Sequence, residues 1–137
     1  MRLGAMAAGG DGRILTRLEE VIRERRTAVP APGAKPSYTR SLFDKGLPKI
    51  GAKIREEAGE TVEAGAEVEA AGADAAAVEK ARAHLVAEVA DLVFHTMVLM
   101  GKFNVPIEDV YRELERRFGT SGIDEKNARS QNQPQKK

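Results

Sequence analysis

The sequence predicts an all-α protein, an antiparallel bundle of long helices that is completed by dimerisation. Apolar residues recur at spacings of three and four along several segments, which is the period of a helix with one buried face. No segment shows the strict alternation of a half-buried strand, and only 4% of the residues are aromatic, so aliphatic side chains must form the core. The 137 residues suit one domain. We assign it to residues 1–119, with a polar, flexible tail at 120–137.

The first helix is expected from Gly12 to Arg26, with Asp11 as its N-cap. A connector follows at 28–36, where three prolines and a glycine oppose regular structure. A short helical turn then ends at Gly46.

A second helix is expected to begin at Pro48, because proline is favoured at the first helical position. Its apolar side is assigned to residues that follow one another mostly in steps of four: Leu47, Ile50, Ile54, Ala58 and Val62. Lys49 and Lys53 fall on another side, together with acidic residues.

Glycine, alanine and aspartate at 72–74 predict a turn, while the Ala/Gly-rich stretch 64–77 around it is compatible with either helix or loop. A third helix is expected from Ala75 to Phe103, and a fourth from Pro106 to Phe118.

Composition excludes several kinds of site. The chain has no cysteine, so a metal would be held by oxygen or imidazole.

The apolar run Leu92–Met100 is shorter than the roughly 20 residues of a membrane span, and the first ten residues do not resemble a secretory signal. We therefore expect a soluble, cytoplasmic protein.

Basic residues are in excess in the first part of the chain and acidic residues in the rest. Residues 1–55 hold 12 Lys/Arg and 5 Asp/Glu, and residues 56–137 hold 10 and 16. A basic segment that runs into an acidic one suits a phosphorylated small molecule bridged through metal better than it suits nucleic acid.

Glu56, Glu57 and Glu60 are three and four residues apart, so their carboxylates project from adjacent turns of one helix surface. Taken alone, these three residues are explained more simply by a solvated acidic face. Glu88 and Asp91 lie three residues apart on the third helix, and Glu88 shares its 3-4-3-4 spacing with apolar residues and His95. Buried carboxylates are normally paired, protonated or bound to metal, so this seam favours a metal site.

Mg²⁺ prefers oxygen ligands and keeps contacts with substrate phosphates, and Mn²⁺ can substitute for it. The predicted metal ligands are Glu57, Glu60, Glu88 and Asp91.

Three further residues have two interpretations each. Lys49 and Lys53 would bind substrate phosphates, or they are surface lysines, with Lys53 paired to Glu56 or Glu57. His95 would contact substrate, or it is a core histidine hydrogen-bonded to its neighbours.

The pattern Glu-Glu-x-x-Glu followed by Glu-x-x-Asp resembles the all-α nucleotide pyrophosphatases of the MazG-like superfamily. The segments 37–39, 45–47, 49–60 and 90–95 look, more narrowly, like those of the phosphoribosyl-ATP pyrophosphatases of histidine biosynthesis. This resemblance covers Leu15 to Phe118. Gly51 inside the second helix, the stretch between the acidic motifs and the polar tail depart from the pattern.

The resemblance implies a Mg²⁺-dependent helical homodimer that hydrolyses phosphoribosyl-ATP to phosphoribosyl-AMP and pyrophosphate. It gives Glu57, Glu60, Glu88 and Asp91 the role of metal ligands, and Glu56 the role of orienting or deprotonating the attacking water. Two rivals stay open. One is a house-cleaning nucleoside triphosphate pyrophosphatase, and the other is a non-catalytic helical interaction domain.

Overall fold

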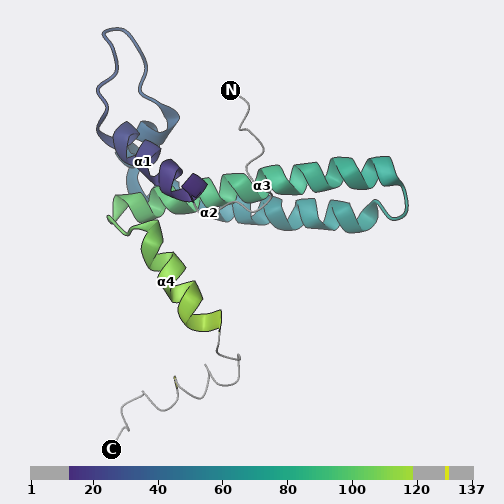
Figure 1. The fold of residues 1–137 in the computed structure, drawn as a ribbon. Helices are drawn as coiled ribbons and strands as arrows, with labels where there is room; N and C mark the ends of the chain where they lie inside the picture. The colour runs from purple at the N-terminus through teal and green to yellow at the C-terminus, as the bar shows by residue number, and fades with distance from the viewer. Residues whose placement is uncertain (1–12, 119–128, 130–137) are drawn as a thin grey trace, which may run out of the picture.

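The computed structural model describes residues 13–118 and 129, and the part it describes is all-α, as predicted (Figure 1). The helices are α1 (Arg13–Thr27), α2 (Tyr38–Ala70), α3 (Ala75–Lys102) and α4 (Ile107–Phe118). The predicted N-cap at Asp11 and nearly all of the predicted tail lie outside the described residues.

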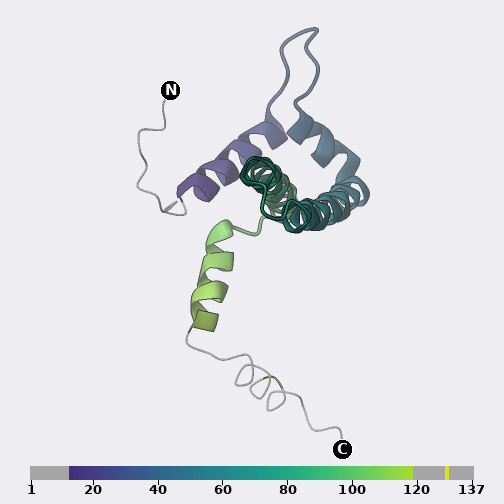
Figure 2. The ribbon, with the colours of Figure 1, turned by 90° about the vertical axis from the view of Figure 1, so that its right-hand side faces the viewer.

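Helices α2 and α3 form a long antiparallel hairpin that dominates the molecule (Figures 1 and 2). Its turn lies where the sequence predicts it: Gly72 has a positive φ of 59°, and the Asp74 side chain accepts hydrogen bonds from the backbone N–H groups of Ala76 and Ala77. Helix α2 runs through Gly65 without a break, so the Ala/Gly-rich stretch is helix up to Ala70. A glycine inside a helix costs only about 1 kcal/mol, which packing along the hairpin can offset.

Helix α2 is kinked at Gly46, whose φ of 72° and ψ of −164° are not helical. Pro48 follows within the first turn of the straight part of the helix. Glycine tolerates this conformation and proline suits the start of a helix, so the predicted stop at Gly46 and restart at Pro48 are both present in the backbone.

The prediction for the apolar side of α2 is partly wrong. Leu47 and Val62 are 48% and 74% exposed, whereas the buried residues of α2 after Pro48 are Ile50, Glu57 and Ala64. Steps of four residues drift around a helix by about 40° each, while steps of seven return to nearly the same side. The buried stripe therefore follows the seven-residue spacing, and it places a glutamate in the middle of the hairpin.

The core lies at the end of the hairpin where α1 crosses it (Figure 1). Its buried apolar side chains are Ile22, Leu42, Ile50, Met97, Val98 and Ile107. The Arg26 guanidinium stacks over the Phe43 ring at 5.0 Å and donates to the Gly101 carbonyl oxygen at 2.6 Å, which ties α1 to both long helices.

Helix α4 points away from the hairpin and contacts α1 at its first turn (Figure 1). Ile107 is buried there, and its backbone N–H donates to Oε2 of Glu19 on α1 at 2.6 Å.

Within the described part of the chain, α3 is long and apolar enough to cross a membrane by length and composition alone. The same helix carries Glu88 and Asp91 and packs along α2. Length and composition of this kind are shared by the core helices of soluble bundles.

Candidate functional site

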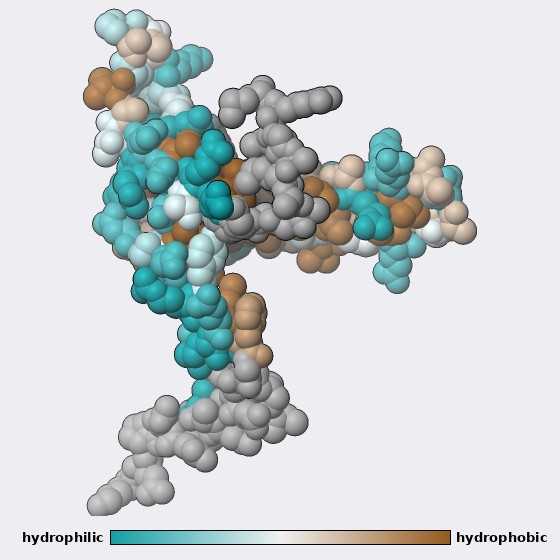
Figure 3. Space-filling view, in the orientation of Figure 1, coloured by the Kyte–Doolittle hydropathy of each residue, from teal (hydrophilic) through white to brown (hydrophobic). Residues whose placement is uncertain are grey.

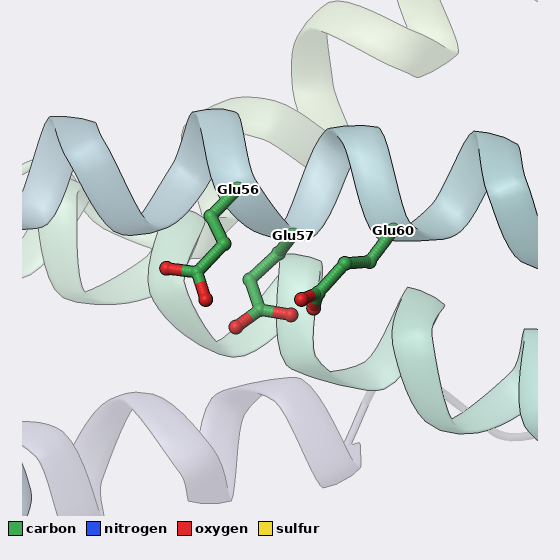
Figure 4. A group of neighbouring side chains, drawn as sticks. All are labelled: Glu56, Glu57 and Glu60. Carbon is green, nitrogen blue, oxygen red and sulfur yellow. The ribbon is translucent and has the colours of Figure 1, made fainter.

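The two acidic motifs meet across the α2–α3 hairpin. Glu56, Glu57 and Glu60 project from one side of α2 toward α3 (Figure 4). Carboxylate oxygens of these three residues lie within 4.8 Å of one another, and so do those of a second set formed by Glu57, Glu88 and Asp91. We call these five residues the carboxylate cluster, and Glu57 is the member common to both sets.

Two oxygens of the cluster are buried without a hydrogen-bond partner. They are Oε2 of Glu57 and Oε2 of Glu88, and no other buried side-chain oxygen or nitrogen among residues 13–118 is in this state. Glu57 as a whole is only 5% exposed. An unsatisfied buried polar group costs about 1–3 kcal/mol, and more when it is charged. A hard divalent cation would satisfy both oxygens, and a set of carboxylates is the donor set that Mg²⁺ prefers.

Lys53 partly neutralises the cluster. Its Nζ lies 3.0 Å from Oε2 of Glu56 and 3.1 Å from Oε1 of Glu57. The hydrogen bond to Glu56 is the main reason that the pKa of Lys53 is raised, so this group is cationic. Of the two interpretations, the structure shows the paired lysine, whereas Lys49 is exposed one turn earlier.

The pKa values of Glu57 and Glu60 are shifted in opposite directions. Burial raises the pKa of Glu57, but hydrogen bonds to Lys53 and Glu60 outweigh it, and the net shift is downward. The pKa of Glu60 is raised, chiefly because its side chain hydrogen-bonds to Glu57. The cluster therefore holds a proton at Glu60 more readily than an isolated glutamate does, and a cation would compete with that proton.

His95 is buried at 4% exposure and both of its ring nitrogens are occupied. Nδ1 donates to the Asp91 carbonyl oxygen at 2.7 Å, and Nε2 is hydrogen-bonded to the Tyr38 hydroxyl at 2.8 Å. Tyr38 also stacks on Phe94, with ring centroids 6.3 Å apart. The structure thus shows the hydrogen-bonded core histidine, and the substrate contact of His95 stays a prediction.

Sequence reasoning missed His84, which touches the cluster from the solvent side. Its Nε2 lies 2.9 Å from Oε1 of Glu88 and its Nδ1 lies 2.9 Å from Oε2 of Glu67 on α2. Hydrogen bonds to Glu67 and then Glu88 raise the pKa of His84. The spacing of four between His84 and Glu88 was a detectable signal, but the contact with Glu67 depends on how the two helices align.

The chain is similar to proteins of one family over most of its length. The family model for phosphoribosyl-ATP pyrophosphohydrolase matches residues 15–118. A phosphoribosyl-ATP pyrophosphatase of Geobacter sulfurreducens is 44% identical over 118 residues, covering 86% of this chain and 94% of the relative. That of Novosphingobium aromaticivorans is 46% identical, covering 87% and 96%, and that of Ralstonia pickettii is 47% identical, covering 82% and 86%. No solved structure matches the chain.

Proposed function

Because the chain belongs to the phosphoribosyl-ATP pyrophosphohydrolase family, we propose that it acts on its substrate with a Mg²⁺ cofactor held by the carboxylate cluster. The reaction is the hydrolysis of phosphoribosyl-ATP to phosphoribosyl-AMP and pyrophosphate, the second step of histidine biosynthesis. The family assignment leaves no role for the rival view of a non-catalytic interaction domain.

One observation carries the proposal of a metal. Glu57 on α2 and Glu88 on α3 each bury an oxygen that no hydrogen bond satisfies, and both lie within one group of potential ligand atoms. Glu57, Glu60, Glu88 and Asp91 would hold the ion, and Mn²⁺ would fit the same oxygen ligands. When bound, it would supply positive charge to the phosphates and lower the pKa of a nearby water.

Glu56 is the proposed general base. Its side chain is 52% exposed at the edge of the cluster, so water can reach it. Its ion pair with Lys53, at 3.0 Å, fixes one oxygen, and the other oxygen would accept the proton of the attacking water. Attack of the oriented water on the α-phosphorus would break the α–β phosphoanhydride bond and release pyrophosphate.

Lys49 and Lys53 are the proposed phosphate contacts. Lys49 is exposed and free to move toward a ligand, whereas Lys53 already neutralises Glu56 and Glu57. We therefore assign the contact with the polyphosphate mainly to Lys49. Lys53 would take part once Glu57 binds the metal, while it keeps its ion pair with Glu56.

A homodimer is proposed as the working form. Val110, Leu114 and Phe118 of α4 are 36%, 47% and 84% exposed, and Val62 and Val86 on the hairpin are 74% and 69% exposed. Figure 3 shows apolar surface along one side of α4 and along the hairpin. Only 17% of the apolar stretch of α3 is buried within one copy of the chain, so a second copy would cover what this copy leaves open. Light scattering on the purified protein tests it.

We place the enzyme in the cytoplasm, where its substrate would be found. A nucleotide that carries several phosphate charges does not cross a lipid bilayer unaided. The proposed partner of the site is this small molecule rather than nucleic acid, since the relatives are named for activity on phosphoribosyl-ATP.

A substrate panel with and without metal tests the proposal. We expect pyrophosphate release from phosphoribosyl-ATP in Mg²⁺ or Mn²⁺, loss of activity in chelator, and little release from dUTP or dCTP. Full activity in chelator would overturn the metal site. Faster turnover of dUTP or dCTP than of phosphoribosyl-ATP would favour a house-cleaning enzyme instead.

A further inference from the structure

We propose that His84 is a positioning residue of the carboxylate cluster, which holds one oxygen of Glu88 so that the other faces the metal. The inference rests on the proposed metal site and adds a residue that lies outside the two acidic motifs.

His84 bridges the two long helices at the edge of the cluster. Its Nε2 is 2.9 Å from Oε1 of Glu88, one turn further along α3, and its Nδ1 is 2.9 Å from Oε2 of Glu67 on α2. The ring is therefore held at both nitrogens, once from each helix.

The two oxygens of Glu88 have different environments as a result. Oε1 accepts the hydrogen bond from His84, while Oε2 is buried without a partner. Glu88 belongs to the group of potential metal ligands that includes Glu57 and Asp91, and the unpartnered Oε2 is the oxygen that we assign to the metal. A glutamate side chain has three rotatable bonds and would otherwise sample several positions. Fixing Oε1 removes most of this freedom before any cation arrives.

Packing does not orient the His84 ring. The ring lies in a shallow depression whose lining includes the small side chains of Ala70, Ala77 and Ala81, and the side chain is 45% exposed. The contact with Glu67 supplies the orientation that a tight pocket would otherwise give. Outer groups of this kind set the geometry of metal ligands, and their loss typically weakens metal affinity about 10- to 100-fold.

The two partners of His84 differ in exposure. The pair with Glu67, which is 55% exposed, contributes little to folding stability, whereas Glu88 is only 15% exposed and loses a hydrogen-bond donor when His84 is replaced by alanine. H84Q keeps a donor for Glu88 and is therefore the variant that separates metal binding from folding.

The direct test is a titration of the purified protein with Mn²⁺, in which electron paramagnetic resonance counts the free ion. We expect H84A to raise the Kd for Mn²⁺ about 10- to 100-fold over wild type. H84Q should recover part of the affinity, because its amide N–H can donate to Glu88. The matched control is K80A, which removes an exposed positive charge from the same depression and should leave the Kd unchanged.

Two further measurements complete the test. The Tm of H84Q in chelator should equal that of wild type, because the glutamine keeps a donor for Glu88. In steady-state assays, H84A should need more Mg²⁺ for half-maximal activity, while kcat at saturating Mg²⁺ and the KM for phosphoribosyl-ATP return toward wild-type values.

An H84A protein that binds Mn²⁺ as tightly as wild type overturns the inference and leaves the proposed metal site standing. A loss of affinity that comes with a lower metal-free Tm and is not restored in H84Q also overturns it, in favour of a structural role. If wild type itself binds no Mn²⁺, the metal site fails and the inference fails with it.

Discussion

Lys53 and Glu57 form an ion pair inside the carboxylate cluster, with Nζ 3.1 Å from Oε1 and side chains 18% and 7% exposed. The pair explains how Glu57 can be buried and ionised before a cation binds. It also predicts how stability responds when the lysine is removed.

Lys53→Met should lower the free energy of unfolding in chelator by about 1–3 kcal/mol, because the buried Glu57 carboxylate loses its charged partner. At saturating Mg²⁺ the deficit should shrink, since the cation takes over neutralisation. Urea denaturation under both conditions measures this. Lys49→Met, one turn earlier and exposed, should change stability by less than about 0.5 kcal/mol. An equal deficit with and without Mg²⁺ would speak against metal at Glu57.

The neighbouring glutamates should differ in their effect on catalysis. Glu56→Gln removes a proposed general base, and such groups contribute about 10²- to 10⁴-fold. Glu57→Gln removes the ligand common to both carboxylate sets and should reduce kcat further, because positioning and charge stabilisation are lost together.

Pyrophosphate release from phosphoribosyl-ATP, at saturating Mg²⁺, compares the two variants. Wild type in chelator is the control for a site without metal. A Glu57→Gln protein that is more active than Glu56→Gln would reverse the assigned roles.

The helices and their breaks could be predicted from the sequence because each break has a local chemical cause. Gly46, Pro48 and Asp74 act through their own backbone or through neighbours a few residues away. The buried side of α2 could not be predicted as well. Steps of four and of seven from Ile50 both fit the sequence, and only packing against α3 selects Glu57 and Ala64 over Val62.

The same distinction applies to the candidate site: features set by spacing within one helix could be predicted, and contacts between helices could not. Glu88 could be predicted to lie in an apolar seam from spacing on its own helix. The contact between His84 and Glu67 joins residues 17 apart on two helices, and its existence depends on the register of the hairpin. For His95 and Lys53 the sequence left two interpretations, since a polar residue near a site can either hold its neighbours or meet a ligand.

Glu60→Gln should stabilise the metal-free protein near neutral pH. The pKa of Glu60 is raised in the folded state by its hydrogen bond with Glu57, so its ionisation opposes folding. In wild type this opposition grows as the pH rises from the ordinary glutamate value of 4.5 through the raised pKa, and glutamine removes it.

Thermal unfolding in chelator between pH 4 and 8 tests the direction in which the stability difference changes with pH. The Tm of Glu60→Gln should exceed that of wild type by an increasing margin as pH rises, while its affinity for Mn²⁺ should be lower. A constant difference across the range would show that Glu60 titrates normally.

Tyr38→Phe removes only the hydroxyl that is hydrogen-bonded to His95. The variant keeps the ring stacked on Phe94 but leaves Nε2 of a buried histidine without its hydrogen-bond partner, which costs about 1–3 kcal/mol. Ser41→Ala, which removes an exposed hydroxyl bonded to the Tyr38 carbonyl oxygen, should cost less than about 0.5 kcal/mol. Urea denaturation measures both, and the KM for phosphoribosyl-ATP reports whether His95 also contacts substrate. Equal stability of Tyr38→Phe and wild type would contradict the assigned hydrogen bond.

Glu19 caps α4 from a distant helix, and its removal should loosen α4 selectively. The first N–H groups of a helix have no partner within it, and that of Ile107 donates to Oε2 of Glu19 at 2.6 Å. Losing such a cap costs about 0.5–2 kcal/mol. In Glu19→Ala, hydrogen exchange should accelerate in the amides of α4 and not in those at the tip of the α2–α3 hairpin. Glu19→Gln keeps an acceptor oxygen and should resemble wild type, and Glu20→Ala removes an exposed neighbouring charge as the control. Uniform acceleration through all helices would mean that Glu19 supports the whole fold, because its effect would then pass through the core that α1 shares with the hairpin and not through the end of α4.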